Sequence, residues 1–168
     1  MITKFINRIL RRDPMVKHTQ ANNSGAPKRI PKKAHRIDPH LLSKNAVKVT
    51  DTLQQAGFEA FIVGGAVRDL ALGIGPKDFD VATNATPDQV QRLFRKARLI
   101  VRRFQIVHVT FFGKGHPEII EVSTFRALLD NAGDHVAESG RILRDNVWGS
   151  QDEDAARRDF TINAMYYD

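Results

Sequence analysis

Residues 61–69 read FIVGGAVRD and decide how the chain is organised around its chemistry. The first half of this stretch continues a short, apolar, β-prone run and predicts a buried strand. Gly64 and Gly65 follow at once, and residues 66–72 then predict a short helix. Two glycines between a strand and a helix let the backbone approach a ligand closely. The start of the helix offers N–H donors to an anion, and Arg68 adds a guanidinium that matches phosphate.

A pair of carboxylates follows this turn. Asp78 and Asp80 belong to residues 77–83, which predict a second strand. Side chains alternate along a strand, so the two carboxylates share one face while Phe79 and Val81 point into the core. Two like charges so close repel each other, and a divalent cation is the natural compensation. Mg²⁺ suits the pair, because it accepts one or two carboxylates together with phosphate oxygens.

A third carboxylate would complete a site for two metal ions. Glu121 stands within the apolar strand predicted for residues 118–125, which is an unusual place for an acid with only a structural role. We therefore expect Glu121 to join Asp78 and Asp80. Glu118 begins the same strand, and we expect it to be exposed.

The remaining elements complete an α+β pattern. Apolar residues recur at helical spacing over residues 42–56, and residues 86–97 begin with the helix-start sequence Thr-Pro-Asp-Gln. Residues 99–103 and 106–112 predict two more strands. The order of these elements predicts a mixed β-sheet with helices packed on it.

Charge is distributed unevenly. Residues 1–48 carry twelve Lys and Arg against two Asp, and the rest of the chain is slightly acidic. Residues 1–12 place apolar side chains on one helical face, and residues 13–33 are rich in Pro, Asn, Ser, Gly and Lys. We expect a basic, partly disordered leader over residues 1–33 and a folded domain over residues 34–168. The leader predicts a polyanionic partner, either RNA or an anionic membrane surface, with a protein partner as the alternative.

Composition excludes several classes of protein. The 168 residues include no cysteine, which excludes disulfides, a Cys-ligated zinc site and a cysteine nucleophile. No apolar run reaches the ~20 residues of a spanning helix. We therefore expect a cytoplasmic protein, with peripheral contact to the inner membrane face as an alternative. The histidines show no metal-ligand spacing, and we expect His108 in or near the core.

Four motifs in order resemble the polymerase-beta-type nucleotidyltransferases, and within them the class that holds bacterial poly(A) polymerases and tRNA CCA-adding enzymes. The motifs are residues 61–69, 77–80 (KDFD), 121–126 (EVSTFR) and 157–164 (RRDFTINA). The resemblance covers roughly residues 34–168, and it implies a polymerase-beta-like nucleotidyltransferase head. It also implies transfer of a nucleoside monophosphate from a nucleoside triphosphate to an RNA 3′ hydroxyl, with two Mg²⁺ ions or alternatively Mn²⁺.

The resemblance further implies roles for individual residues. Three acids would be catalytic and metal-binding: Asp78, Asp80 and Glu121. Seven residues would bind the nucleotide: Gly64, Gly65, Arg68, Arg157, Arg158, Asp159 and Asn163. Without the resemblance, residues 152–158 predict only a surface helix whose charges complement its dipole.

Several features favour poly(A) polymerase within this class. They are the basic leader and residues 35–37 (HRI), 102–104 (RRF) and 143–146 (LRDN). We therefore expect ATP and an RNA 3′ end as substrates, with template-independent addition of AMP. CCA addition to tRNA is the alternative, and a non-catalytic RNA-binding module is a second one. The class reads the base with a helical region that follows the catalytic domain, so we expect residues 1–168 to be a truncated head that alone binds nucleotide weakly and turns over poorly.

Overall fold

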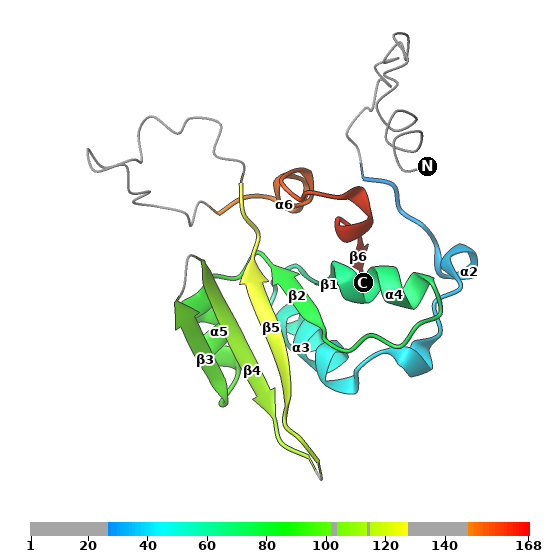
Figure 1. Cartoon of the computed structure of the whole chain (residues 1–168). Helices are drawn as coiled ribbons and strands as arrows, with labels where there is room; N and C mark the ends of the chain where they lie inside the picture. Colours follow the sequence, from blue (N-terminus) through cyan, green and yellow to red (C-terminus); the bar gives the residue numbers. More distant parts are fainter. Residues whose placement is uncertain (1–26, 102–103, 114, 128–147) are drawn as a thin grey trace, which may run out of the picture.

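The computed structural model describes residues 27–101, 104–113, 115–127 and 148–168 (Figure 1). Its strands are β1 (Ala60–Val63), β2 (Asp80–Thr83), β3 (Ala97–Val101), β4 (Gln105–Phe111), β5 (Glu118–Thr124) and β6 (Tyr166–Tyr167). They form one sheet in the order β3-β4-β5-β2-β1-β6. The β2–β5 pair is parallel and the other pairs are antiparallel, so the predicted mixed sheet is confirmed.

Short helices pack around this sheet. The described helices are α2 (Lys32–His35), α3 (Lys44–Gln55), α4 (Gly65–Ala71), α5 (Pro87–Leu93) and α6 (Gln151–Ala156), with 3-10 turns η1 (Pro39–Leu41) and η2 (Thr161–Asn163). In Figure 1, α3 and α5 lie behind the sheet and α6 lies beyond the end of β5. Capping boxes begin α5 and α6, where Thr86 and Ser150 each exchange hydrogen bonds with the residue three positions later.

The main core lies between one sheet face and the helices α3, α4 and α5. Leu53 of α3 and Val90 of α5 are buried there against Ile62, Val81 and Val122. Because side chains alternate along each strand, the neighbours of these strand residues lie on the opposite face. One face is therefore committed to the main core, and the other carries a smaller apolar cluster of Val63, Ala82 and Phe125 as well as polar side chains.

Two elements differ from the sequence prediction. The helix expected over residues 86–97 ends at Leu93, and Phe94 is already extended. Ala97, the last residue of the expected helix, instead opens β3, two residues before the strand expected over residues 99–103, because its pairing with β4 outweighs the local helical pattern. The strand expected over residues 77–83 begins only at Asp80.

Glu118 also departs from expectation. It is half-buried rather than exposed, and its carboxylate accepts hydrogen bonds from Ser43 Oγ and Asn45 Nδ2. Ser43 is at the same time the N-cap of α3. Glu118 therefore fastens the start of α3 to the start of β5.

Some expectations lie outside the described residues. They concern the leader up to residue 26, residues 102–103 and residues 143–146. In the part of the chain that the structure describes, no helix is both long enough and apolar enough to cross a membrane.

Residues 148 and 149 lie against the end of β5. Arg126 and Trp148 pair across a β-bridge, and the N–H of Gly149 donates to Phe125 O at 3.0 Å. A Cβ on Gly149 would lie 2.7 Å from Ala127 N and 2.9 Å from Ala127 Cα. Only glycine fits this contact, which fixes where α6 begins relative to the end of β5.

We predict that Gly149→Ala destabilises the domain by about 1 to 3 kcal/mol, the usual effect of forcing an extra carbon into a packed site. Here the carbon meets backbone, which cannot rotate away. Urea unfolding followed by circular dichroism measures the change. Gly113→Ala is the matched control, since a Cβ there meets nothing within 4 Å. Equal stability of the two variants would contradict the prediction.

Candidate active site

Asp80 and Glu121 stand side by side on neighbouring strands. Asp80 opens β2, and the parallel register of β2 with β5 places it opposite Glu121. Both side chains are exposed, whereas Val81 and Val122 beside them are buried in the main core. Alternation along the two strands thus brings two of the three expected acids onto the face opposite that core.

Asp78 lies just before β2 rather than on the strand. It is exposed, and Phe79 after it is buried, so the expected alternation is kept although the strand begins later. The Asp78 side chain lines a hollow of about 400 Å³ together with Lys77 and His116. The charge of Asp78 still raises the pKa of Asp80, as does the charge of Glu121, so both acids interact electrostatically with Asp80.

The pKa of Asp80 is raised above its usual value. Although the side chain reaches solvent, surrounding protein removes part of its hydration, and this is the largest cause. The negative charges of Glu121 and Asp78 raise the pKa further, while Arg158 acts in the opposite direction. Burial and the two neighbouring carboxylates thus both disfavour the charged form of Asp80, and a bound cation would favour it.

The neighbouring carboxylates of Asp80 and Glu121 suit a divalent cation. Within the described ranges, no group of three Asp, Glu or His side chains is close enough together to hold a metal ion unaided. Asp80 and Glu121 provide a pair of carboxylates, and Mg²⁺ is commonly bound by one or two carboxylates plus water and substrate phosphate. The residues present therefore fit Mg²⁺ bound together with a phosphate ligand, rather than an all-protein cage.

His108 contacts Glu121 from the other side. Its Nε2 lies 3.2 Å from Glu121 Oε1 across the β4–β5 pair. The histidine is half-buried on the face of Glu121 rather than in the core. The signal was present in the sequence, because Val107 and Val109 are apolar neighbours that alternation turns inward.

A cavity of about 570 Å³ opens beside Asp80. Asp80 lines it together with all seven residues that the resemblance nominates for nucleotide binding. Those seven are Gly64, Gly65, Arg68, Arg157, Arg158, Asp159 and Asn163. They come from two distant segments, the β1–α4 turn and the chain after α6, which are joined where the N–H of Gly64 donates to Met165 O at 3.1 Å.

Gly64 lines this cavity. Its φ of 73° and ψ of −135° define a backbone conformation that side chains disfavour. A Cβ there would also stand 3.5 Å from Nη1 of Arg158. The positive φ therefore makes glycine the favoured residue at the sharp turn from β1 into α4, and the guanidinium of Arg158 lies next to this turn.

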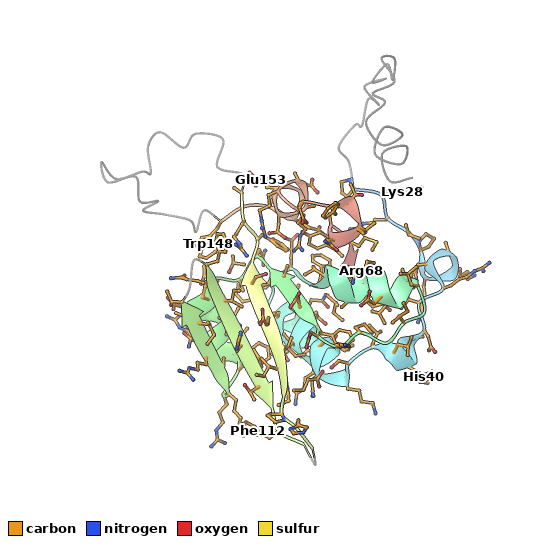
Figure 2. The ribbon with its side chains drawn as sticks, in the orientation of Figure 1. Lys28, His40, Arg68, Phe112, Trp148 and Glu153 are labelled. Carbon is orange, nitrogen blue, oxygen red and sulfur yellow. The ribbon has the colours of Figure 1, made fainter. Side chains whose placement is uncertain are left out.

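Arg68, which Figure 2 labels on α4, is held by two acceptors. Its Nε donates to Asp69 Oδ1 at 2.9 Å, and its Nη1 donates to Asn163 Oδ1 at 3.2 Å. Asn163 belongs to η2, so this hydrogen bond ties α4 to the segment after α6. The amide of Asn163 thus orients a cation at the cavity.

Asp154 on α6 is a residue that sequence reasoning missed. Its carboxylate is completely buried, although the charges of this helix predict a surface position. Arg157, Arg158 and the Tyr166 hydroxyl all donate to it. Burial raises the pKa of Asp154, but these donors outweigh burial and hold the pKa below its usual value. The i,i+3 and i,i+4 spacing to the two arginines was the available signal.

Arg158 is a well-anchored cation of the cavity wall. Its Nη2 donates to Asp154 Oδ2, and its Nη1 donates to Asn163 O at 3.2 Å. Its buried Nε has no hydrogen-bond partner among the described residues. Burial disfavours its charge, but Tyr166 and Asp154 more than compensate and raise the pKa of the guanidinium. Arg158 therefore stays charged in the folded domain.

Residues 60–168 match the sequence model of the family described as Poly A polymerase head domain. The chain belongs to this family. A poly(A) polymerase I from Salmonella typhi is 54% identical to this head domain over 143 residues, which are 82% of this chain and 30% of that protein. A CC-adding tRNA nucleotidyltransferase from Halalkalibacterium halodurans is 38% identical over 122 residues, which are 73% of this chain and 26% of that protein. This poly(A) polymerase head domain thus spans less than a third of the length of those relatives.

A solved structure supports the same assignment. The crystal structure of the Bacillus stearothermophilus CCA-adding enzyme in complex with CTP matches this head domain with a TM-score of 0.54 and 36% identity. The match covers 73% of this chain and 27% of that one. The fold expected from the resemblance, a polymerase-beta-like nucleotidyltransferase head, is confirmed.

We predict that Asp80→Asn stabilises the head domain at neutral pH when divalent cations are removed with EDTA. A carboxyl whose pKa is raised by folding binds protons more tightly in the folded state, so wild-type stability falls as the pH rises through that pKa. Asn carries no charge and escapes this loss. The melting temperature of the variant should therefore exceed that of the wild type at pH 7, and the difference should shrink at acidic pH.

Asp51→Asn is the matched control, because Asp51 is an exposed acid on α3 far along the chain from the site. It should leave the melting temperature nearly unchanged. Adding Mg²⁺ should narrow the gap between Asp80→Asn and the wild type, since a ligand stabilises only the protein that binds it. A variant that melts below the wild type in EDTA at pH 7 would sink the prediction.

Proposed function

We propose that this head domain transfers AMP from ATP to RNA 3′ ends, without a template and with two divalent cations. The observation that carries the proposal is the shared cavity, which is lined by Asp80 and by three arginines. A nucleoside triphosphate needs cationic donors for its phosphates and a metal-binding acid beside them. One cavity offers both.

Three acids would hold Mg²⁺, with Mn²⁺ as the alternative ion: Asp78, Asp80 and Glu121. Bound there, the ions would offset the phosphate charge and lower the pKa of the attacking hydroxyl. The raised pKa of Asp80 supports this role, because burial and the charges of Glu121 and Asp78 disfavour its carboxylate form and a bound cation would favour it. One carboxylate oxygen of Glu121, Oε1, also contacts His108.

The chain's own residues would bind and orient the nucleotide. Gly64 and Gly65 leave the backbone of the β1–α4 turn open to phosphate oxygens, and Arg68 and Arg158 supply guanidinium donors at the same cavity. Asn163 would act by orienting Arg68. In the reaction, the RNA 3′ oxygen forms a bond to the α-phosphorus, the bond from that phosphorus to the bridging oxygen breaks, and pyrophosphate leaves.

Arg157 and Asp159 complete the cavity wall after α6. Arg157 donates through Nε to Asp154 Oδ1 at 2.9 Å, which fixes the guanidinium at the wall. Asp159 is exposed, and its carboxylate accepts the N–H of Phe160 at 2.9 Å. We infer that both residues contact the nucleotide once it occupies the cavity.

Relatedness favours AMP addition over CCA addition. Identity is 54% to a protein named poly(A) polymerase I and 38% to one named CC-adding tRNA nucleotidyltransferase. The alternative, CCA addition to tRNA, is supported by the likeness to a CCA-adding enzyme in complex with CTP. The two activities share the chemistry of the cavity and differ in the base that is added.

We predict that the protein, with Mg²⁺ and ATP, extends an unstructured RNA by a ladder of adenylates. Asp78→Ala should lower the rate on the order of 10²-fold or more, because a metal ligand that stabilises transition-state charge is lost. A sequencing gel with labelled RNA measures single additions, so slow turnover still registers. Asp51→Asn is the control and should keep the wild-type rate.

The same gel separates the alternatives. CTP alone should not replace ATP on the unstructured RNA. Growth that stops after C, C and A on a tRNA lacking its CCA end would replace the proposal by CCA addition. RNA binding that survives both EDTA and Asp78→Ala, with no nucleotide added, would instead indicate a non-catalytic RNA-binding module.

A further inference from the structure

Asp154 holds an unusual position for a carboxylate. It is completely buried, and its two oxygens receive donors from three separate segments of the chain. Nε of Arg157 lies 2.9 Å from Oδ1, Nη2 of Arg158 lies 3.0 Å from Oδ2, and the Tyr166 hydroxyl lies 2.6 Å from Oδ2. The N–H of Arg126, just after β5, donates to Oδ1 at 3.2 Å. One carboxylate thus joins α6, β6 and the end of the strand that carries Glu121.

The two arginines on this carboxylate both line the cavity. Two guanidiniums share the Asp154 carboxylate, and Arg158 also acts on Asp80 at the same cavity. Both arginine side chains stay partly exposed at the cavity instead of being sealed in the core. Fixed guanidinium donors at an open cavity suit an anionic ligand.

The position of Arg158 indicates which part of the ligand is held. Its Nη1 lies 3.5 Å from the Cβ position of Gly64, so it stands at the turn that leaves backbone open to phosphate. Hydrogen bonds continue from Arg158 through Asn163 to Arg68, whose Nη2 lies 3.6 Å from the Cβ position of Gly65. One guanidinium beside each glycine of the turn suits a chain of several phosphates better than a single one.

We propose that Asp154 is a positioning residue for the triphosphate, holding Arg157 and Arg158 at the cavity wall before the nucleotide arrives. This inference rests on the proposed function, since it takes ATP as the ligand. Asp154 is too deeply buried to touch ATP, and it acts through the arginines. Fixing their side chains in advance removes an ordering cost that binding would otherwise include.

We predict that Asp154→Asn weakens ATP binding by about tenfold or more while binding of AMP changes much less. Asn keeps the size of the side chain and removes the charge that orients both arginines. Isothermal titration with Mg²⁺ present, below the melting temperature of each variant, gives both dissociation constants. The ratio of AMP to ATP dissociation constants is the decisive quantity, because general loosening of the cavity would weaken both ligands alike.

Asp152→Asn is the matched control, an exposed acid two residues earlier on the same helix, and it should bind ATP like the wild type. Tyr166→Phe is the second variant, in case Asp154→Asn fails to fold. It keeps the ring that packs against Phe61 and Phe125 and removes only the hydroxyl bonded to Asp154. Tyr166 does not line the cavity, and its hydroxyl interacts with both Asp154 and Arg158, so we expect about threefold or greater loss of ATP affinity to act through this cluster.

The outcomes separate this inference from the proposed function. If the wild-type protein binds neither ATP nor AMP, the proposed function fails and the inference fails with it. If the wild type binds ATP and a folded Asp154→Asn keeps the same AMP-to-ATP ratio, the inference alone is overturned. If Asp154→Asn does not fold, an unchanged ratio in Tyr166→Phe overturns it equally.

Discussion

Parallel hydrogen bonding between β2 and β5 forces the carboxylates of Asp80 and Glu121 to share one face of the sheet. Their repulsion opposes this pairing, and together with the larger effect of burial it raises the pKa of Asp80. The pairing survives because Val81 and Val122, the next residues on the same strands, are buried in the main core. Apolar burial on one face therefore holds an unfavourable charge arrangement on the other. Such local conflict is typical of functional sites.

The arginines that line the cavity have the opposite electrostatic requirement. There, cations must stay charged and fixed near protein atoms, and Asp154 and Asn163 supply the acceptors that keep Arg158 and Arg68 in place. Strands β2 and β5 carry Asp80 and Glu121, whereas the arginines of the cavity belong to α4 and to the segment after α6. A ligand that carries both phosphates and a bound cation matches this division of charge.

The sequence predicted those features that depend on neighbouring residues. The turn at Gly64 follows from two adjacent glycines, and the exposure of Asp78 and Asp80 on either side of buried Phe79 follows from alternation, although β2 begins only at Asp80 and the two acids line different cavities. The first part of the cavity set could be nominated from the glycine turn itself. The four cavity residues after α6 could be nominated only through resemblance, because no local pattern links the turn at residue 64 with the segment around residue 160. Relatedness supplied what spacing could not.

The misses share a physical cause, which is contact between residues far apart in the chain. Glu118 is half-buried because Ser43 and Asn45 reach it, and no pattern near residue 118 encodes that contact. Asp154 looked like a surface charge because its tyrosine partner lies twelve residues later, beyond the helix. A helix end at Leu93 likewise reflects the pairing of residues 97–101 with β4.

The β-bridge between Arg126 and Trp148 has a consequence for how the domain would respond to a break in its backbone. The hydrogen bond from Gly149 to Phe125 lies beside the bridge, and the N–H of Arg126 donates to Asp154 on α6. Non-covalent contacts therefore connect the end of β5 to α6 independently of the chain between them. A single cut of the backbone between residues 127 and 148 would leave these contacts in place.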